Sequence, residues 1–177
     1  MNYREEICYA MRLLGQDPRT IFLGQAVAYP GTSMSGTLAG VPEEKLIELP
    51  VMEEAQMGMS TGLAISGFVP ISIYPRWNFL LLATNQIVNH LDKLPIYSNG
   101  GYRPKVIIRT GIAADTPLNP QSQHLGDFTD AFRLMCQTIE VIRLDRPGDI
   151  VPAYEYALRR GDGRSTILVE HTARLAL

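Results

Sequence analysis

Cysteine and histidine are scarce in this sequence of 177 residues, which contains two cysteines, Cys8 and Cys136, and three histidines. The two cysteines match no metal-binding spacing and are too few for a disulfide framework. We therefore expect both to be reduced thiols in a cytoplasmic protein, and the sequence predicts no metal site of its own.

Excess positive charge and long apolar runs are also missing. The formal net charge of −2 argues against the basic surface that nucleic-acid-binding proteins use. No apolar run approaches the roughly 20 residues that span a bilayer, and residues 1–6 lack the basic start of a signal peptide. With 46% hydrophobic and 19% charged residues, we expect a single globular domain over residues 1–177, with an N-terminal helix at 3–15 and a core at 20–175.

What the chain does contain is an alternation of strand-like and helix-like segments. The predicted strands are residues 20–23, 45–49, 69–74, 105–110, 139–143 and 166–170. The predicted helices are residues 3–15, 54–67, 78–91, 127–136 and 147–160. This alternation is typical of an α/β fold with a parallel sheet flanked by helices on both faces. No glycine-rich phosphate loop follows a predicted strand, which argues against a flavodoxin-like binding domain.

Several polar segments follow predicted strands. They are the long loop at 25–42, Glu53, residues 74–77 and the loop at 110–124. The carboxyl ends of parallel strands share one edge of the sheet, and ligands bind there. We therefore expect these segments to gather at a single site.

Glu53 and Glu54 stand at the start of a helix that carries almost no charge from residue 55 to residue 69. Acidic residues in a first turn complement the helix dipole, which is the simplest interpretation. The lack of charge also predicts a helix that is buried on most sides, so that a carboxylate at its start lies at the edge of a core. Such a position suits chemistry as well as it suits helix capping.

From residue 21 to residue 175 the sequence resembles the pyrimidine-binding domain of thiamine diphosphate enzymes, in particular 2-oxo acid dehydrogenase beta subunits and transketolases. The matching segments follow the order of that family. They are Phe22-Leu23-Gly24-Gln25, the P-x-x-E and G-x-x-x-G pattern of Pro50 to Gly62, Trp77-Asn78-Phe79 with Asn85-Gln86-Ile87-Val88-Asn89, Gly100-Gly101, Val106-Ile107-Ile108-Arg109, Gln123-His124 and Val169-Glu170-His171.

The resemblance implies a role for Glu53. In the family, a carboxyl group at this position hydrogen-bonds ring nitrogen N1′ of the cofactor and helps its 4′-amino group to remove the thiazolium C2 proton. Successive helical residues point about 100° apart, so Glu54 cannot face the same ring. We expect Glu54 to be structural.

The resemblance also implies that Tyr74, Trp77 and Phe79 contact the cofactor, because an aromatic side chain of this segment stacks on the aminopyrimidine in the family. Aromatic walls suit a flat heterocycle. The alternative is that Trp77 and Phe79 are core residues at a strand-to-helix turn.

Three further residues are implied on the substrate side. Arg76 would meet an anionic substrate or a neighbouring carboxylate. His124 would face the thiazolium and move protons, with Gln123 beside it, or it would be an ordinary hydrogen-bonded loop histidine. Leu125 stands where the family usually has serine. His90 and His171 are expected to be structural.

Residues 161–163, Gly-Asp-Gly, match the start of the family's diphosphate and Mg²⁺ motif, but only 14 residues follow them. We therefore predict a turn there. We identify no segment that resembles the family's diphosphate-binding domain or C-terminal domain, so we expect a pyrimidine-binding domain that is either encoded alone or a fragment of a longer protein.

The resulting hypothesis is a small subunit of a split thiamine diphosphate enzyme, whose partner subunit holds Mg²⁺ and the diphosphate. It would serve 2-oxo acid decarboxylation or ketol transfer. The alternative is a non-catalytic scaffold or regulatory homologue. We also expect self-association through the helix at 54–67, because Gly58 and Gly62 allow close packing of another helix.

Overall fold

The computed structural model describes residues 1–113, 119 and 121–175. Its centre is a six-stranded sheet in the order β2-β1-β3-β4-β6-β5, in which neighbouring strands pair in parallel. The strands are β1 (Thr20–Gly24), β2 (Leu46–Glu48), β3 (Val69–Ile73), β4 (Ile107–Ile112), β5 (Glu140–Arg143) and β6 (Thr166–His171). Each lies within two residues of its predicted start, so the strand predictions are confirmed.

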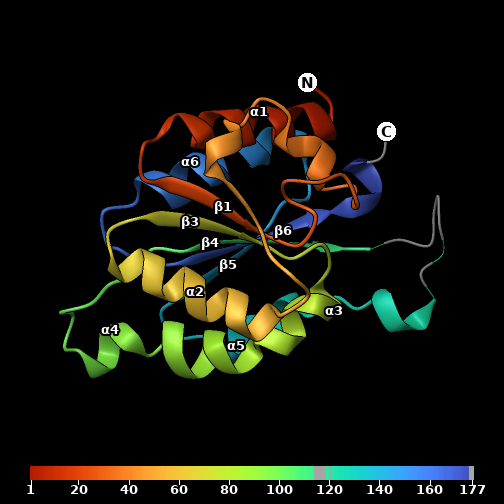
Figure 1. Ribbon diagram of the computed structural model, residues 1–177. Coiled ribbons are helices and arrows are strands. Elements are labelled where there is room, and N and C mark those ends of the chain that lie inside the picture. Colours follow the sequence, from red (N-terminus) through yellow and green to blue (C-terminus); the bar gives the residue numbers. More distant parts are fainter. Residues whose placement is uncertain (114–118, 120, 176–177) are drawn as a thin grey trace.

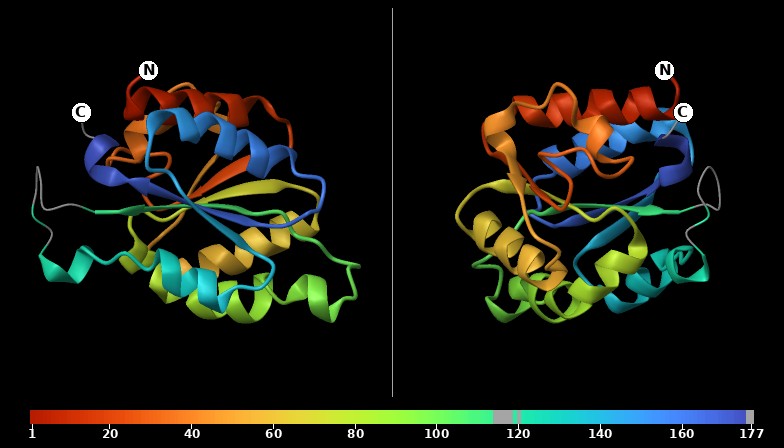
Figure 2. Two further views of the ribbon diagram at one scale, coloured as in Figure 1. Left: turned by 180° about the vertical axis from the view of Figure 1, so that it is seen from behind. Right: turned by 45° about the vertical axis from the view of Figure 1, so that its right-hand side comes forward.

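Helices cover both faces of the sheet, which confirms the predicted fold class (Figure 1). The helices are α1 (Tyr3–Gln16), α2 (Glu53–Ile65), α3 (Trp77–Leu80), α4 (Leu94–Tyr97), α5 (Thr129–Met135) and α6 (Pro147–Arg159). The first and last lie side by side on one face, and the other four lie on the opposite face (Figure 2). None of the helices in the described ranges is long and apolar enough to cross a bilayer.

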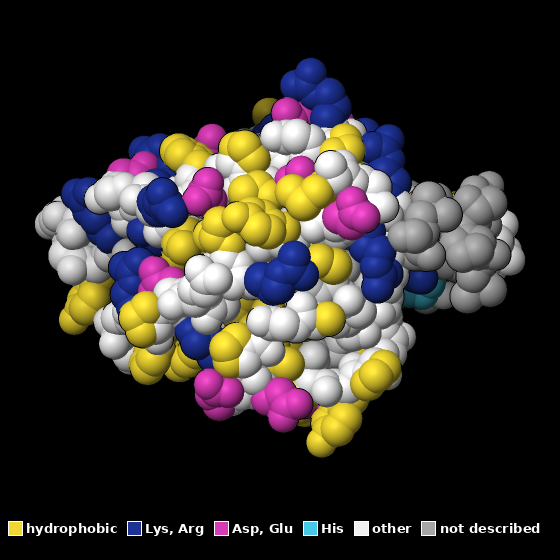
Figure 3. All heavy atoms as spheres, turned by 90° about the horizontal axis from the view of Figure 1, so that it is seen from above, with side chains coloured by type: hydrophobic (Ala, Val, Ile, Leu, Met, Phe, Trp, Pro, Cys, Tyr) yellow, Lys and Arg dark blue, Asp and Glu magenta, His cyan; other side chains and the backbone are white. Residues whose placement is uncertain are grey.

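Each face of the sheet has its own hydrophobic core. On one face, Ile7 and Met11 of α1 and Ile150 of α6 are fully buried in the first core. On the other face, Met57 of α2 and Phe132 of α5 are fully buried in the second. Viewed from the α1 side, charged side chains of both signs surround smaller apolar groups (Figure 3).

Helix α1 is fixed at its first turn by local and by distant contacts. Asn2 and Glu5 form a reciprocal capping box, with N–H···O distances of 2.9 and 2.8 Å, as expected for a stable helix start. The Tyr3 hydroxyl donates to the Leu144 carbonyl at 2.9 Å and accepts from the His171 backbone N–H at 3.0 Å. The start of the chain is therefore attached to segments that follow β5 and end β6.

A buried ion pair joins β4 to β6. Arg109 donates to both carboxylate oxygens of Glu170, at 2.5 and 2.9 Å, and neither side chain is exposed. The Tyr154 hydroxyl of α6 also donates to Glu170. Burial opposes the charge of Arg109, yet Glu170 and Tyr154 raise its pKa above the ordinary value.

The segment at 78–91 differs from its prediction as one helix capped by Asn78. It consists of α3, a 3₁₀ turn at Leu81–Ala83 and a π-helical stretch at Gln86–Leu91. The helix starts after Arg76, whose side chain makes no capping bond, so Asn78 lies inside the first turn. A π-helix closes wider i→i+5 turns, which apolar spacing in a sequence does not distinguish from an α-helix.

Candidate functional site

The strand order reverses between β1 and β3. After β1 the chain continues to β2 at one edge of the sheet, whereas after β3 it continues to β4 on the other side. Open α/β sheets bind ligands at such a switch point, beside the carboxyl ends of the strands. A narrow cleft of about 10 Å³ lies there, between the ends of β1 and β3 and the start of α2.

Glu53 lines this cleft as the first residue of α2. Glu53 is buried, with an exposed fraction of only 8%. In the described part of the chain, the carboxylate makes no hydrogen bond and no ion pair. The Tyr74 hydroxyl donates to the Glu53 backbone carbonyl at 3.2 Å. Tyr74 therefore anchors the backbone of Glu53. Burial raises the pKa of the Tyr74 hydroxyl well above its ordinary value.

The two predicted aromatic residues take different positions. Phe79 lines the cleft with Glu53. Trp77 is fully buried in the second core, where its ring lies 4.9 Å from the ring of Phe132. The structure therefore separates a cleft residue, Phe79, from a core residue, Trp77.

His124 lies beside Phe79, with the two rings stacked at a centroid distance of 5.3 Å. The Nδ1 atom of His124 is buried and has no hydrogen-bond partner among the described residues. His124 and Gln123 belong to a short 3₁₀ turn, Ser122–His124. Residues 114–118 and 120 of the predicted loop lie outside the described residues. Arg76, at the start of α3, is half-buried.

Glu54 points away from the cleft, as expected. Its carboxylate accepts hydrogen bonds from Asn85 and Gln86 of the neighbouring helical segment, at 3.3 and 3.4 Å. Both glutamates border a wide, shallow hollow that also includes Gly58 and Leu82. Glu53 thus lies where the cleft meets the outer surface of α2.

The exposure of the outer surface of α2 shows that the prediction of a helix buried on most sides is wrong. Only Glu53, Gln56, Met57 and Ser60 of α2 are buried. We define the α2 face as the exposed apolar residues on and beside this helix. They are Met52, Met59, Ile65, Phe68 and Leu82.

Sequence reasoning missed Gln56, which is 3% exposed and lines the cleft. Its amide nitrogen donates to Leu23 O, Ser72 Oγ and Ile73 O at 3.3, 3.1 and 3.0 Å. The available signal was its spacing, because a residue three positions after Glu53 lies on the same side of a helix.

Glu48 was also missed. Its carboxylate, at the end of β2, accepts hydrogen bonds from the backbone N–H groups of Ala26, Val27 and Ala28 at 2.6, 2.8 and 2.8 Å. Burial opposes ionisation, but these N–H groups outweigh it, so the pKa of Glu48 lies below its ordinary value. Successive N–H groups in a concave loop form an anion-binding nest, and here the protein's own carboxylate fills it.

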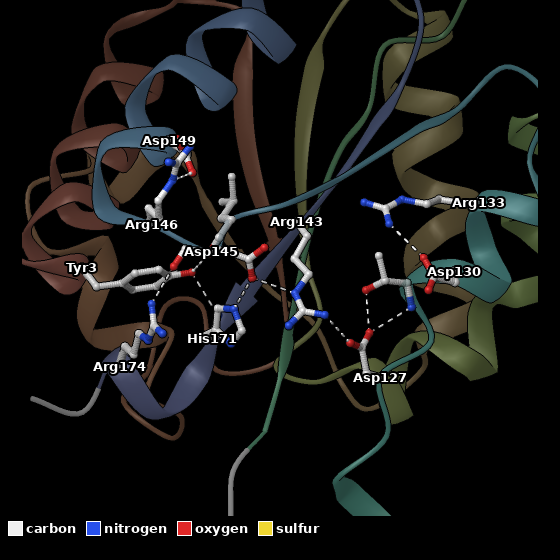
Figure 4. A network of polar contacts seen from close by, with 12 residues as sticks. Tyr3, Asp127, Asp130, Arg133, Arg143, Asp145, Arg146, Asp149, His171 and Arg174 are labelled. Carbon is white, nitrogen blue, oxygen red and sulfur yellow. Dashed lines mark hydrogen bonds and ion pairs between the residues drawn. The ribbon is translucent and has the colours of Figure 1, made fainter.

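A further polar network lies at the same edge of the sheet, beyond the cleft (Figure 4). Arg143 lies between Asp127 and Asp145, at 2.9 and 2.8 Å. Asp145 in turn lies 2.9 Å from His171 Nε2, and this hydrogen bond contributes most to lowering the pKa of Asp145. His171 therefore connects secondary-structure elements, in line with its expected structural role.

The remaining sequence predictions concern a turn and metals. Residues 161–163 form a turn, in which Asp162 pairs with Arg160 at 2.7 Å. No group of three or more potential metal-ligating side chains occurs in the ranges that the structure describes.

Comparison with known proteins finds beta subunits of 2-oxo acid dehydrogenases among the relatives of this chain. No family model matches the sequence. The chain is 28% identical over 159 residues to the pyruvate dehydrogenase E1 component subunit beta of Gracilaria tenuistipitata var. liui, a match that covers 88% of this chain and 47% of the relative. It is 27% identical over 143 residues to the 3-methyl-2-oxobutanoate dehydrogenase subunit beta of Mycobacterium tuberculosis, covering 77% and 39%. The chain thus spans less than half the length of these relatives.

Among solved structures, a split gene transketolase described as an inactive beta4 tetramer superposes with a TM-score of 0.71. The match covers 96% of this chain and 51% of that one, at 18% sequence identity, so it supports the fold alone. Together, these findings confirm the resemblance found in the sequence: the homologues are beta subunits of 2-oxo acid dehydrogenases, and the fold is that of transketolase structures.

Proposed function

We propose that this chain, a homologue of 2-oxo acid dehydrogenase beta subunits, is the pyrimidine-binding subunit of a thiamine diphosphate-dependent enzyme. The observation that carries the proposal is the Glu53 carboxylate, which borders the cleft at the switch point and has no hydrogen bond or ion pair among the described residues. Phe79 lies in the wall of this cleft, and an aromatic wall suits a flat heterocycle. The whole cofactor is larger than this space.

The residues of the cleft have distinct roles in this proposal. Glu53 hydrogen-bonds ring nitrogen N1′, and Phe79 stacks on the aminopyrimidine. Tyr74 holds the Glu53 backbone through its hydroxyl, and Trp77 packs against Phe132 in the core. When bound, thiamine diphosphate supplies the carbon nucleophile, and a carboxyl group at N1′ promotes its activation.

The substrate side of the site is formed by His124, with Gln123 beside it, and by Arg76. His124 stacks on Phe79 and has an unpaired buried Nδ1 among the described residues, so it is positioned to exchange a proton with a substrate. Arg76 would bind a carboxylate. The relatives matched in sequence are named as 2-oxo acid dehydrogenases, which favours decarboxylation of a 2-oxo acid over ketol transfer.

A partner subunit completes the site in this proposal by holding Mg²⁺ and the diphosphate. The filled nest supports this division, because Glu48 already occupies the loop amides that could have bound a phosphate. We also propose self-association through residues 54–67, which carry much of the α2 face. Reduced cysteines favour a cytoplasmic location.

We expect Glu53→Gln to slow C2–H exchange of the cofactor by at least about 100-fold in the complex with the partner subunit, because an amide cannot share a proton with N1′. Glu54→Gln is the matched control, since the Glu54 carboxylate accepts hydrogen bonds from Asn85 and Gln86 on the outer side of α2. The exchange is measured by proton NMR in deuterated buffer. Equal rates in the two variants would refute the assignment of Glu53, and a complex that binds cofactor without exchange would support a non-catalytic scaffold instead.

A further inference from the structure

Gln56 lies one helical turn after Glu53, on the inner side of α2. This side of the helix is polar where it meets the sheet, since Glu53, Gln56 and Ser60 are all buried there. Buried polar side chains are unfavourable unless they are hydrogen-bonded. The contacts of Gln56 therefore explain why an amide occupies this position.

The Gln56 amide nitrogen joins the ends of two strands. It donates to the backbone carbonyls of Leu23 in β1 and Ile73 in β3, and it also reaches Ser72 Oγ. Carbonyl oxygens only accept hydrogen bonds, so they fix which end of the amide is the nitrogen. The Gln56 side chain is thus held in one orientation across the switch point.

Ser60 and Gly24 lie close to the Gln56 amide or to its partners. The Ser60 hydroxyl donates to the Gln56 backbone carbonyl at 2.9 Å and lies 3.0 Å from Ser72 Oγ, the side-chain acceptor of the Gln56 amide. Gly24 adopts φ +153°, and a Cβ added there would lie 3.2 Å from the Gln56 amide nitrogen and 2.5 Å from Ile73 O. A larger residue at position 24 would therefore displace the amide.

The start of α2 has no side-chain cap, because Met52 at the N-cap makes no capping bond. A helix start without a cap lacks one of its usual anchors. The first turn is instead held to the sheet by Tyr74, which binds the Glu53 carbonyl, and by Gln56. Both contacts act within one turn of the Glu53 carboxylate.

We propose that Gln56 is a positioning residue for Glu53: it fixes the first turn of α2 on the ends of β1 and β3, so that the carboxylate meets the bound ring at the correct place. This inference rests on the proposed function. Displacements of about 1 Å at a reacting group lower rates by as much as about 100-fold. Gln56 would therefore affect activation of the cofactor more strongly than its binding.

The test uses Gln56→Met, which keeps the length of the side chain but removes the donor, and Gln56→Glu, which keeps the shape but cannot donate. Ser72→Ala is the mild variant, because it removes one of the three acceptors. Ile71→Val is the matched control: it trims the buried core side of β3 and leaves the amide contacts in place. Hydrogen exchange of the Met57 and Gly58 amides in the free chain reports opening of the first turns of α2, and C2–H exchange reports activation of the cofactor in the complex.

We expect both Gln56 variants to speed amide exchange at Met57 and Gly58 and to slow C2–H exchange about 10- to 100-fold, with cofactor affinity changed less than about threefold. Ser72→Ala should show a smaller change in the same direction, and Ile71→Val should match the wild type in both readouts. Wild-type behaviour of the Gln56 variants would overturn the positioning role and leave the proposed function intact. A wild-type complex that does not catalyse C2–H exchange of the cofactor would overturn the proposed function. Amide exchange at Met57 and Gly58 in the free chain would still show whether Gln56 fixes the first turn of α2.

Discussion

Single residues at the carboxyl edge of the sheet decide which ligands the chain can hold. Glu48 supplies a negative charge to the loop amides that follow β1, and Glu53 leaves its carboxylate available to the cleft. Two glutamates five positions apart thus differ: the Glu48 carboxylate is hydrogen-bonded within the chain, whereas the Glu53 carboxylate has no hydrogen-bond partner among the described residues.

Glu48 gives a prediction about pH. Its pKa is lowered in the folded chain, so the ionised form is stabilised by folding. This stabilisation is fully present above the pKa of an unfolded glutamate, about 4.3, and is lost as the pH falls through the lower folded value. We expect Glu48→Gln to lower the free energy of unfolding by about 1–3 kcal/mol at pH 7 and the difference from the wild type to shrink below about pH 4.

Urea unfolding at several pH values measures this difference. Glu44→Gln is the control, since Glu44 is an exposed neighbour in the same segment, and it should change stability little at any pH. A difference between wild type and Glu48→Gln that stays constant down to pH 3 would show that the nest does not select the ionised form.

The residues of the site were predictable to different degrees. Glu53 follows from the spacing of Pro50 and Gly58 within a known pattern, and Phe79 follows from the same kind of match. The contacts of Gln56 and Glu48 could not be predicted, because their partners lie 16 to 33 and 20 to 22 residues away. Trp77 and Phe79 could not be told apart, since their burial depends on where Phe132 packs.

Among the elements, α2 presents two different surfaces, one toward the sheet and one toward the outside. Its inner side holds Glu53 and Gln56 at the cleft, and its outer side contributes to the α2 face. The two glycines on the outer side leave room: a Cβ at Gly58 would lie 4.0 Å from Gln86 Oε1, and one at Gly62 would meet no atom within 4 Å. A side chain added there would therefore disturb a partner rather than this chain.

We expect Gly58→Leu or Gly62→Leu to dissociate the assembly, because the added side chain separates packed helices, while the fold and melting temperature are retained. Leucine is also a better helix former than glycine. Gly148→Leu is the matched control, since Gly148 lies in α6 on the other face of the sheet and is equally unobstructed. Light scattering decides the question, and a wild-type chain that is monomeric both alone and with its partner would remove the basis for this interface.

Most elements were predicted from alternating apolar patterns, because buried parallel strands and amphipathic helices leave strong signals. The segment at 78–91 was predicted as one α-helix, but the structure has a π-helix at Gln86–Leu91. It lies where Asn85 and Gln86 donate hydrogen bonds to Glu54. The short helix α4 was missed as well. Its four residues are too few to establish a period.

For the whole molecule, the parallel sheet was predictable from the alternation of strands and helices, but the strand order was not, because pairing depends on contacts distant in sequence. The order matters for function, since the reversal between β1 and β3 creates the cleft. The cleft is far smaller than thiamine diphosphate, so most of a ligand of that size would lie against another surface.

We therefore expect the isolated chain to bind thiamine diphosphate weakly, with a Kd well above about 1 µM, even with Mg²⁺ present. The Glu48-filled nest leaves these loop amides no capacity for the diphosphate. Titration calorimetry measures the affinity, and the complex with the partner subunit is the positive control. Sub-micromolar binding by the chain alone would contradict the division of the site between two subunits.

The attachment of α1 to the far end of the sequence has a consequence for biosynthesis. The Tyr3 hydroxyl contacts Leu144 and His171, 141 and 168 residues later, and the apolar side of α1 packs beside α6. While the ribosome is still synthesising the chain, this helix has none of those partners and leaves Ile7, Met11 and Leu14 in water. Contacts so distant in sequence form slowly, and transiently exposed apolar surfaces attract chaperones or aggregate. We therefore expect the nascent chain to complete its fold only after β6, which pairs with both β4 and β5, has been synthesised.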